Sequence, residues 1–107
     1  MGKFAFIVNI LVLLLYKTNG QGWKEHVLTE TFDGPTVVRS LDMDNDGDYD
    51  VLASSYTDKQ VVWFDNENGK GQFSAKKVIA SSSGFMYDVV DADFDCDGKR
   101  DIIFSDG

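Results

Sequence analysis

Five aspartates alternate along residues 41–50, in the stretch LDMDNDGDYD, and a glycine follows the third of them. Two unit charges about 4 Å apart repel by about 1 kcal/mol even in water. The segment must therefore bind a positive charge or be disordered. Gly47 allows a sharp bend that can turn the carboxylate oxygens toward one centre. Oxygen atoms gathered in this way are the ligands that Ca²⁺ prefers. The stretch therefore predicts a calcium loop.

A second acidic loop, ADFDCDGKRD at residues 92–101, repeats this spacing fifty-one residues later. The same offset aligns Val27-Leu28 with Val78-Ile79, and Val51-Leu52 with Ile102-Ile103, without a gap. One offset that fits loops and apolar segments together predicts an internal structural repeat.

The predicted ligands are the matching acids of the two loops. In the first loop they are the side chains of Asp42, Asp44, Asp46 and Asp50, with the backbone carbonyl of Asp48. In the second loop they are the side chains of Asp93, Asp95, Asp97 and Asp101, with the backbone carbonyl of Lys99. Among these ligand positions, the residue type differs between the two loops only at Asp48 and Lys99, where the backbone carbonyl alone would bind.

Other readings of the two loops fit the sequence less well. An EF-hand needs a glutamate at its twelfth position and flanking helices, but these loops have Ala53 and Phe104 there, and a dockerin-like loop fails for the same reason. Zinc favours histidine and cysteine, of which the chain has only His26 and Cys96. Magnesium tends to keep its water. The alternative without metal is a pair of solvated turns, but the in-register repeat favours calcium, in a structural rather than regulatory role.

The segments around the loops are short and rich in β-branched and aromatic residues, which predicts strands. We expect them at residues 23–28, 36–41, 50–56, 60–66, 73–80, 86–92 and 101–105, and no segment has helical periodicity. Turns are expected at residues 57–59 and at Asn68-Gly69. The prediction is an all-β fold of four-stranded antiparallel blades, with a full unit at about 36–80 and a second beginning at about 86. Such repeats build β-propellers.

The N-terminus predicts a secretory signal peptide at residues 1–20. Lys3 precedes an apolar run from Phe4 to Tyr16, and small or turn-forming residues end at Gly20. A membrane anchor is the alternative, but this run is shorter than the roughly 20 residues that span a bilayer. Removal of the segment moves the formal net charge from −8 to −10, because it carries Lys3 and Lys17 and no acid. This charge argues against nucleic acid or an anionic membrane as partner.

The mature chain, residues 21–107, is thus expected to be a secreted, partial β-propeller without a membrane span. Propellers usually close with about four to eight blades, so further blades are expected outside this chain. We expect a fragment of a longer secreted protein, and the alternative is a short subunit that assembles.

Two motifs, DMDNDGDYDVLA and DADFDCDGKRDIIF, resemble the calcium loops of FG-GAP and VCBS repeats, which build integrin-α-like propellers. The segment VVWFDNENGKGQFSAKKVI is similar to the hairpin that closes a VCBS blade. The resemblance covers roughly residues 23–107. It implies a calcium-stabilised propeller for adhesion or ligand binding outside the cell, with a protein or carbohydrate ligand. A propeller of this family has about seven blades, so a ligand face made by several blades would be incomplete here.

An enzyme is not predicted. The only histidine, His26, lies in a predicted strand, and no nucleophile motif accompanies it. Trp63, Phe64 and Phe73 could form a carbohydrate platform, but packing between blades is favoured. Cys96 occupies the place of Asn45 and is interpreted as a tolerated loop residue rather than a thiol for an outside partner. The alternative function is an accessory module at the front of a longer secreted enzyme or carbohydrate-binding protein.

Overall fold

The computed structural model describes residues 11–17 and 22–107, with side chains from His26 onward. These residues form eight strands: β1 (Leu11–Lys17), β2 (Gly22–Thr29), β3 (Pro35–Leu41), β4 (Asp50–Ser55), β5 (Gln60–Phe64), β6 (Lys77–Ser81), β7 (Met86–Ala92) and β8 (Asp101–Asp106). No helix in the described ranges is long and apolar enough to cross a membrane.

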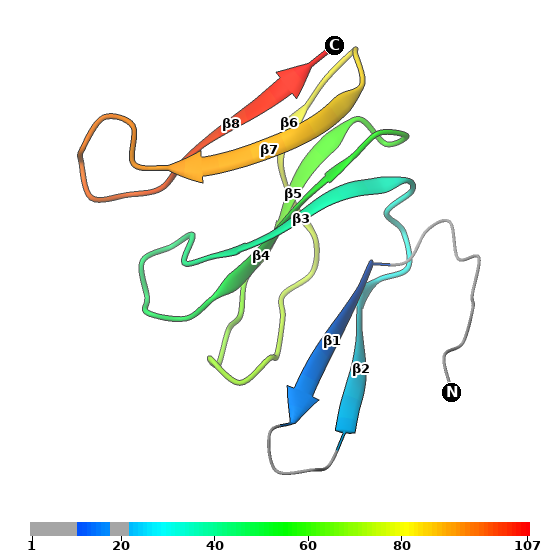
Figure 1. Ribbon diagram of the computed structural model, residues 1–107, viewed down its shortest axis with the longest axis vertical. Helices are drawn as coiled ribbons and strands as arrows, with labels where there is room; N and C mark the ends of the chain where they lie inside the picture. Colours follow the sequence, from blue (N-terminus) through cyan, green and yellow to red (C-terminus); the bar gives the residue numbers. More distant parts are fainter. Residues whose placement is uncertain (1–10, 18–21) are drawn as a thin grey trace.

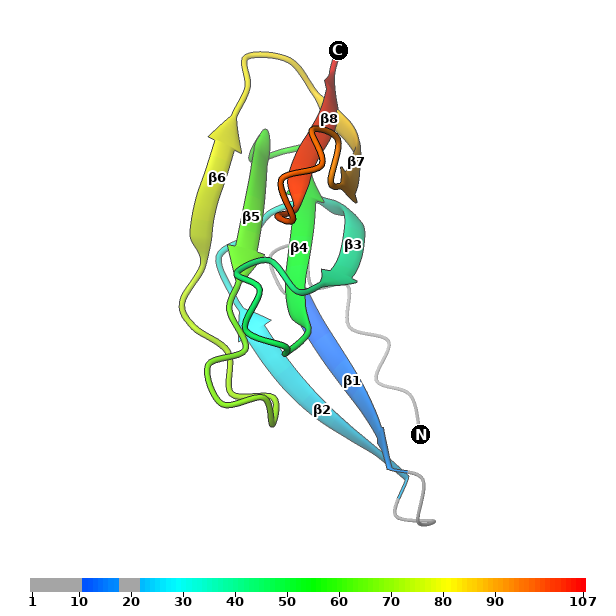
Figure 2. The ribbon, with the colours of Figure 1, turned by 90° about the vertical axis from the view of Figure 1, so that its left-hand side faces the viewer.

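The strands form a four-stranded antiparallel sheet and two hairpins. The sheet has the order β3-β4-β5-β6, and the hairpins are β1-β2 and β7-β8. Figure 1 shows β7-β8 lying against the sheet, whereas β1-β2 extends away from its other side. Figure 2 shows the four strands of the sheet side by side. The predicted all-β fold of antiparallel blades is confirmed.

The hairpin turns follow from backbone conformations that only some residues adopt easily. The turn after β4 ends at Lys59, whose φ is 56°, and the connection after β5 contains Gly69 at φ 65° and Gly71 at φ 91°. Glycine adopts these values without steric cost, so the sequence around Asn68-Gly69 reverses the chain as expected.

The start of β6 differs most from the predicted strand boundaries, most of which lie within two residues of the observed ones. β6 begins at Lys77 rather than at residue 73, because regular pairing with β5 stops at Trp63 and Lys77. Phe73 instead forms an isolated bridge with Asn66. The backbone N–H of Asp65 bonds to the hydroxyl of Ser74 at 3.0 Å, which replaces a ladder hydrogen bond in this irregular stretch.

The N-terminal hairpin bears on two expectations. The strand predicted at 23–28 is β2, and its partner β1 comes from within the predicted signal peptide. Residues 1–10 and 18–20 of that segment lie outside the described residues, so its removal stays a prediction.

Every residue of β4 is buried, because both faces of the sheet are covered. On one face, Val51, Ala53, Val62 and Phe64 pack with Phe32 from the β2-β3 connection. On the other face, Leu41, Leu52 and Val61 pack with Met86 and Val89 of β7. Burying each large apolar side chain contributes about 1.5 to 3 kcal/mol, so the second cluster is the main attachment of β7-β8 to the sheet.

Polar contacts set the alignment of β7 on β3. Arg39 donates from Nε to the carbonyl of Val89 at 3.2 Å and from Nη2 to the carboxylate of Asp88 at 3.3 Å. The Thr36 hydroxyl reaches the carbonyl of Met86 at 3.4 Å. The β3-β4 and β7-β8 hairpins therefore lie alongside one another in nearly the same direction, which brings their connecting loops to one edge.

Candidate metal centres

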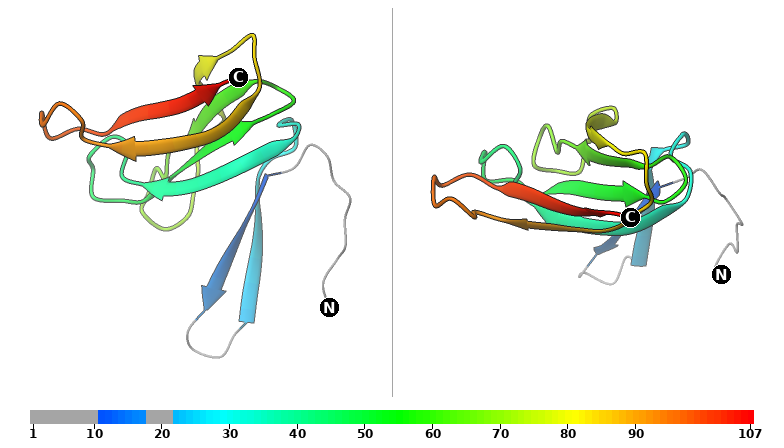
Figure 3. Two further views of the ribbon diagram at one scale, coloured as in Figure 1. Left: turned by 45° about the horizontal axis from the view of Figure 1, so that its top comes forward. Right: turned by 90° about the horizontal axis from the view of Figure 1, so that it is seen from above.

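The two acidic loops project from the same end of the two sheets. One connects β3 to β4 and the other connects β7 to β8, and both lie at the left in Figure 1. Figure 3 shows the same arrangement from two further directions. The repeat thus places two similar anionic loops on neighbouring blades.

Asp42 organises the first loop by accepting hydrogen bonds from its backbone. Its carboxylate receives the N–H of Asp46 at 3.0 Å and that of Gly47 at 2.9 Å. Asp46 in turn accepts the N–H of Asp48 at 2.9 Å. These bonds hold the backbone in a tight turn, because short acidic side chains readily bond to nearby N–H groups.

The second loop repeats these contacts atom for atom. Asp93 accepts the N–H of Asp97 at 3.0 Å and that of Gly98 at 2.8 Å, and Asp97 accepts the N–H of Lys99 at 2.8 Å. Both loops also have left-handed backbone at the same two places, with φ 64° and 92° at Asn45 and Gly47 and φ 61° and 87° at Cys96 and Gly98. The two loops therefore have the same backbone conformation despite their different sequences.

Carboxylates converge in both loops. One oxygen each of Asp42, Asp44 and Asp50 lie within 4.8 Å of one another, and the same holds for Asp93, Asp95 and Asp101. These six acids belong to the predicted ligand set, and the two trios occupy equivalent positions of the repeat. Three oxygens at this spacing suit a hard divalent cation such as Ca²⁺.

The Asp50 carboxylate gives the strongest indication that a cation fits the first loop. Its side chain is 0% exposed, and its carboxylate accepts the N–H of Met43 at 2.9 Å and that of Asn66 at 2.8 Å. No lysine or arginine in the described part of the chain forms an ion pair with it. A buried carboxylate without a positive partner is costly. A cation held with Asp42 and Asp44 would supply the missing charge.

The charge of Asp44 is also disfavoured without a cation. The pKa of Asp44 is raised above its ordinary value, first because the loop removes water from its carboxylate and then because Asp46 and Asp50 are negatively charged. The side chain is exposed on the surface, so this loss of water is only partial. Repulsion of this kind is relieved when a divalent ion binds between the carboxylates.

The structure places the other predicted ligands as follows. Asp46 gathers with Asp44 and Asp65 within 4.8 Å, whereas Asp97 is in no such trio among the described residues. The carboxylate of Asp48 lies against Gly69. A Cβ added to this glycine would lie only 2.5 Å from Oδ1 of Asp48. The ligand roles of the Asp48 and Lys99 carbonyls stay predictions.

Two residues near the first loop were not predicted from the sequence. Asp65 lies beside Asp44 and Asp46, and pairs with Lys77 at 3.2 Å. Asn66 contacts Asp50 directly. The feature that could have identified them is the β4-β5 register. The pairing of Val51 with Phe64 places the residues after β5 beside the start of β4.

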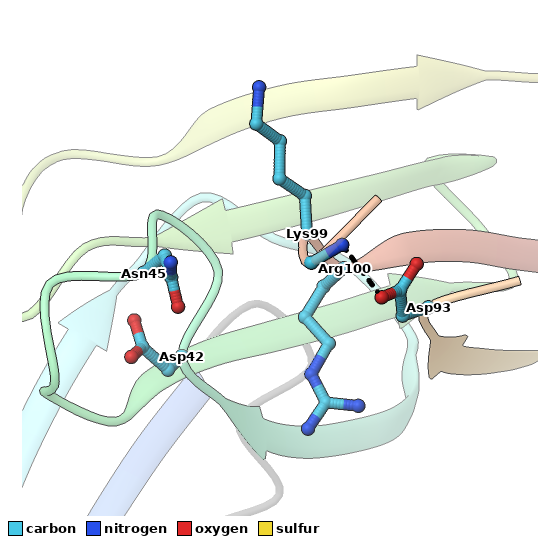
Figure 4. Close-up of a pocket in the computed structure, with 6 residues that line it drawn as sticks. Asp42, Asn45, Asp93, Lys99 and Arg100 are labelled. Carbon is cyan, nitrogen blue, oxygen red and sulfur yellow. Dashed lines mark hydrogen bonds between the residues drawn. The ribbon is translucent and has the colours of Figure 1, made fainter. Parts of the chain in front are cut away.

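A cavity of about 360 Å³ lies between the loops. Its lining residues are Asp42, Asn45, Asp93, Gly98, Lys99 and Arg100. Figure 4 shows Asp42 and Asn45 on one side, Asp93 on the other and Arg100 between them, with the bond from Gly98 to Asp93 dashed. Both loops therefore contribute acids and the second loop contributes bases.

The chain belongs to the FG-GAP-like repeat family, because the family model matches residues 42–104, more than half of the 107 residues. The match begins at the first acid of the first loop and ends within β8, so it spans both loops. No curated protein and no solved structure matches the chain. The FG-GAP resemblance is confirmed, whereas its VCBS and integrin-α-like parts stay predictions.

Proposed function

We propose that this chain is a secreted, calcium-binding module of β-propeller type that serves in adhesion or ligand interaction, with calcium in a structural role. The family and the sheets define a propeller-type repeat module. FG-GAP repeats are a non-catalytic repeat family, and we propose no enzymatic activity for this chain.

The observation that carries the calcium proposal is the buried carboxylate of Asp50. It is fully buried, lacks a basic partner in the described residues, and shares a centre with Asp42 and Asp44. The matching trio of the second loop supports a second site. At a free calcium concentration ten times the dissociation constant, binding would add about 1.4 kcal/mol of stability per site. That contribution is substantial for a domain stabilised by about 5 to 15 kcal/mol.

Exposed aromatic side chains support the ligand-binding part of the proposal. The Tyr56 and Phe85 rings stack with their centroids 4.2 Å apart, and Tyr87 meets Tyr56 edge-on at 5.6 Å. Tyr87 is 55% exposed. The three residues join the two sheets at the end opposite the acidic loops. Aromatic residues are enriched at protein interfaces, so this cluster is a suitable contact for an extracellular ligand.

Calorimetric titration of the full chain with calcium tests the metal proposal. We expect two bound ions in the wild type and one in each of Asp44→Asn and Asp95→Asn, which alter matching exposed acids of the two loops. Glu67→Gln, an exposed acid outside both loops, is the matched control and should keep two. Absence of binding at millimolar calcium would refute the proposal.

Secretion is tested by expressing the chain in secreting cells. Cleavage after Gly20 would give a secreted product that begins at Gln21, as the N-terminal charge and apolar run predict. Mass spectrometry identifies the N-terminus. An intracellular product that retains residues 1–20 would contradict the proposal.

A further inference from the structure

We propose that the two loops bind calcium with unequal affinity, and that Asn66 is the positioning residue that makes the first loop the tighter site. This inference rests on the proposed calcium-binding function and concerns how the chain's own residues divide that function between two similar loops.

Asn66 ties the β5-β6 connection to the first loop through two hydrogen bonds, and a third holds Asn66 within the connection. Its backbone N–H donates to Asp50 Oδ1 at 2.8 Å, and its side-chain Nδ2 donates to the carbonyl of Tyr49 at 3.1 Å. Its side-chain Oδ1 accepts the N–H of Gly71 at 3.0 Å. Asn66 is only 8% exposed, so these bonds are shielded from water. Asp50 and the residue before it are thereby fixed before any ion arrives.

The second loop has a looser counterpart of Asp50. The carboxylate of Asp101 accepts the N–H of Phe94 at 2.9 Å, and no second donor reaches it among the described residues. Its side chain is half-buried, whereas that of Asp50 is fully buried. A ligand held in place before binding loses less conformational entropy when the ion is captured. Within the residues that the structure describes, the first site is therefore better organised.

Charge acts in the same direction. The first loop carries five aspartates and no base, and Asp65 beside it is paired with Lys77 at 3.2 Å. The second loop has four aspartates with Lys99 and Arg100 in its last turn. The guanidinium of Arg100 lies 3.6 Å from Asp91, so one of these bases is partly paired. The first loop is the more negative of the two and attracts a divalent cation more strongly.

The amide signals of Gly47 and Gly98 report on each loop separately. These N–H groups donate to Asp42 and Asp93 at 2.9 and 2.8 Å, so calcium capture by either carboxylate shifts the corresponding nuclear magnetic resonance signal. In a calcium titration of the full chain we expect the Gly47 signal to reach its midpoint at about tenfold lower free calcium than the Gly98 signal.

Two variants separate position from charge. Asn66→Ala keeps the backbone N–H that bonds to Asp50 but removes the side-chain bonds to Tyr49 and Gly71 that hold this N–H in place. It should therefore raise the Gly47 midpoint about tenfold and leave the Gly98 midpoint unchanged. Glu67→Gln, an exposed residue of the same connection whose side chain makes no hydrogen bond among the described residues, is the matched control and should change neither midpoint. Lys99→Asp, which gives the second loop the acid found at Asp48, should move the Gly98 midpoint toward that of Gly47. Lys99 is exposed, so this variant tests the inference even if Asn66→Ala does not fold.

The outcomes distinguish the inference from the function beneath it. If neither glycine responds at millimolar calcium, the proposed function itself fails. If both respond at the same calcium concentration, calcium binding stands and the inequality is overturned. An Asn66→Ala protein that is folded and keeps the wild-type Gly47 midpoint would overturn the role of Asn66.

Discussion

Asn45 and Cys96 show how the repeat tolerates different side chains at one backbone position. Both have left-handed φ values, 64° and 61°, inside loops with matching hydrogen bonds. Asparagine visits this conformation more readily than most residues, and cysteine does not share that preference. The Cys96 side chain is exposed and makes no disulfide. A cysteine is therefore tolerated at this position because its side chain is exposed, although its left-handed backbone conformation modestly lowers the stability of the fold.

This comparison predicts opposite effects for reciprocal substitutions. Cys96→Asn should raise the free energy of unfolding by up to about 1 kcal/mol, and Asn45→Cys should lower it by a similar amount, because only the left-handed preference changes. Urea unfolding in the presence of a calcium chelator measures both effects without a contribution from the metal. A loss of stability in Cys96→Asn would contradict the conformational account.

At the scale of elements, the repeat aligns Leu52 of β4 with Ile103 of β8. Leu52 is 0% exposed because β7 covers it, whereas Ile103 is 53% exposed. Ile103 lies next to Val90, which pairs with it across the hairpin and is also exposed. Equivalent residues thus have unequal surroundings, because in this structure only the first sheet has a second sheet packed on that face.

The same difference predicts unequal costs of truncation. Leu52→Ala should lower the free energy of unfolding by about 2 to 5 kcal/mol, because it leaves a cavity between the sheets. Ile103→Ala should cost much less, about 0.5 kcal/mol, as is usual for exposed positions. Thermal or urea unfolding of both variants measures the difference. Equal costs would mean that the face of β8 is covered in solution, contrary to the structure.

The sequence predicted the strands and loops well because they depend on local residue patterns. The Asp-x-Asp-x-Asp-Gly spacing and the fifty-one-residue offset identified both loops, and apolar segments located β3, β4, β7 and β8. Asp65 and Asn66 were missed because they reach the first loop through strand pairing, from sixteen residues away in the case of Asn66 and Asp50. The late start of β6 was missed because Ser74 interrupts the ladder from its side chain.

At the scale of the whole molecule, charge is concentrated at one edge. The chain has a formal net charge of −8, and the two loops that carry nine of its acids project from the same end of the sheets. The β7 contacts that hold the sheets together also hold these loops near each other. Their mutual repulsion opposes this packing, and bound divalent cations would remove the opposition.

Anomalous diffraction from crystals grown with saturating calcium tests this account most directly. We predict two peaks, one bounded by the carboxylates of Asp42, Asp44 and Asp50 and one by those of Asp93, Asp95 and Asp101. Absence of a peak beside Asp50, with its carboxylate still buried and bonded only to backbone N–H groups, would contradict the central claim that a divalent cation neutralises these loops.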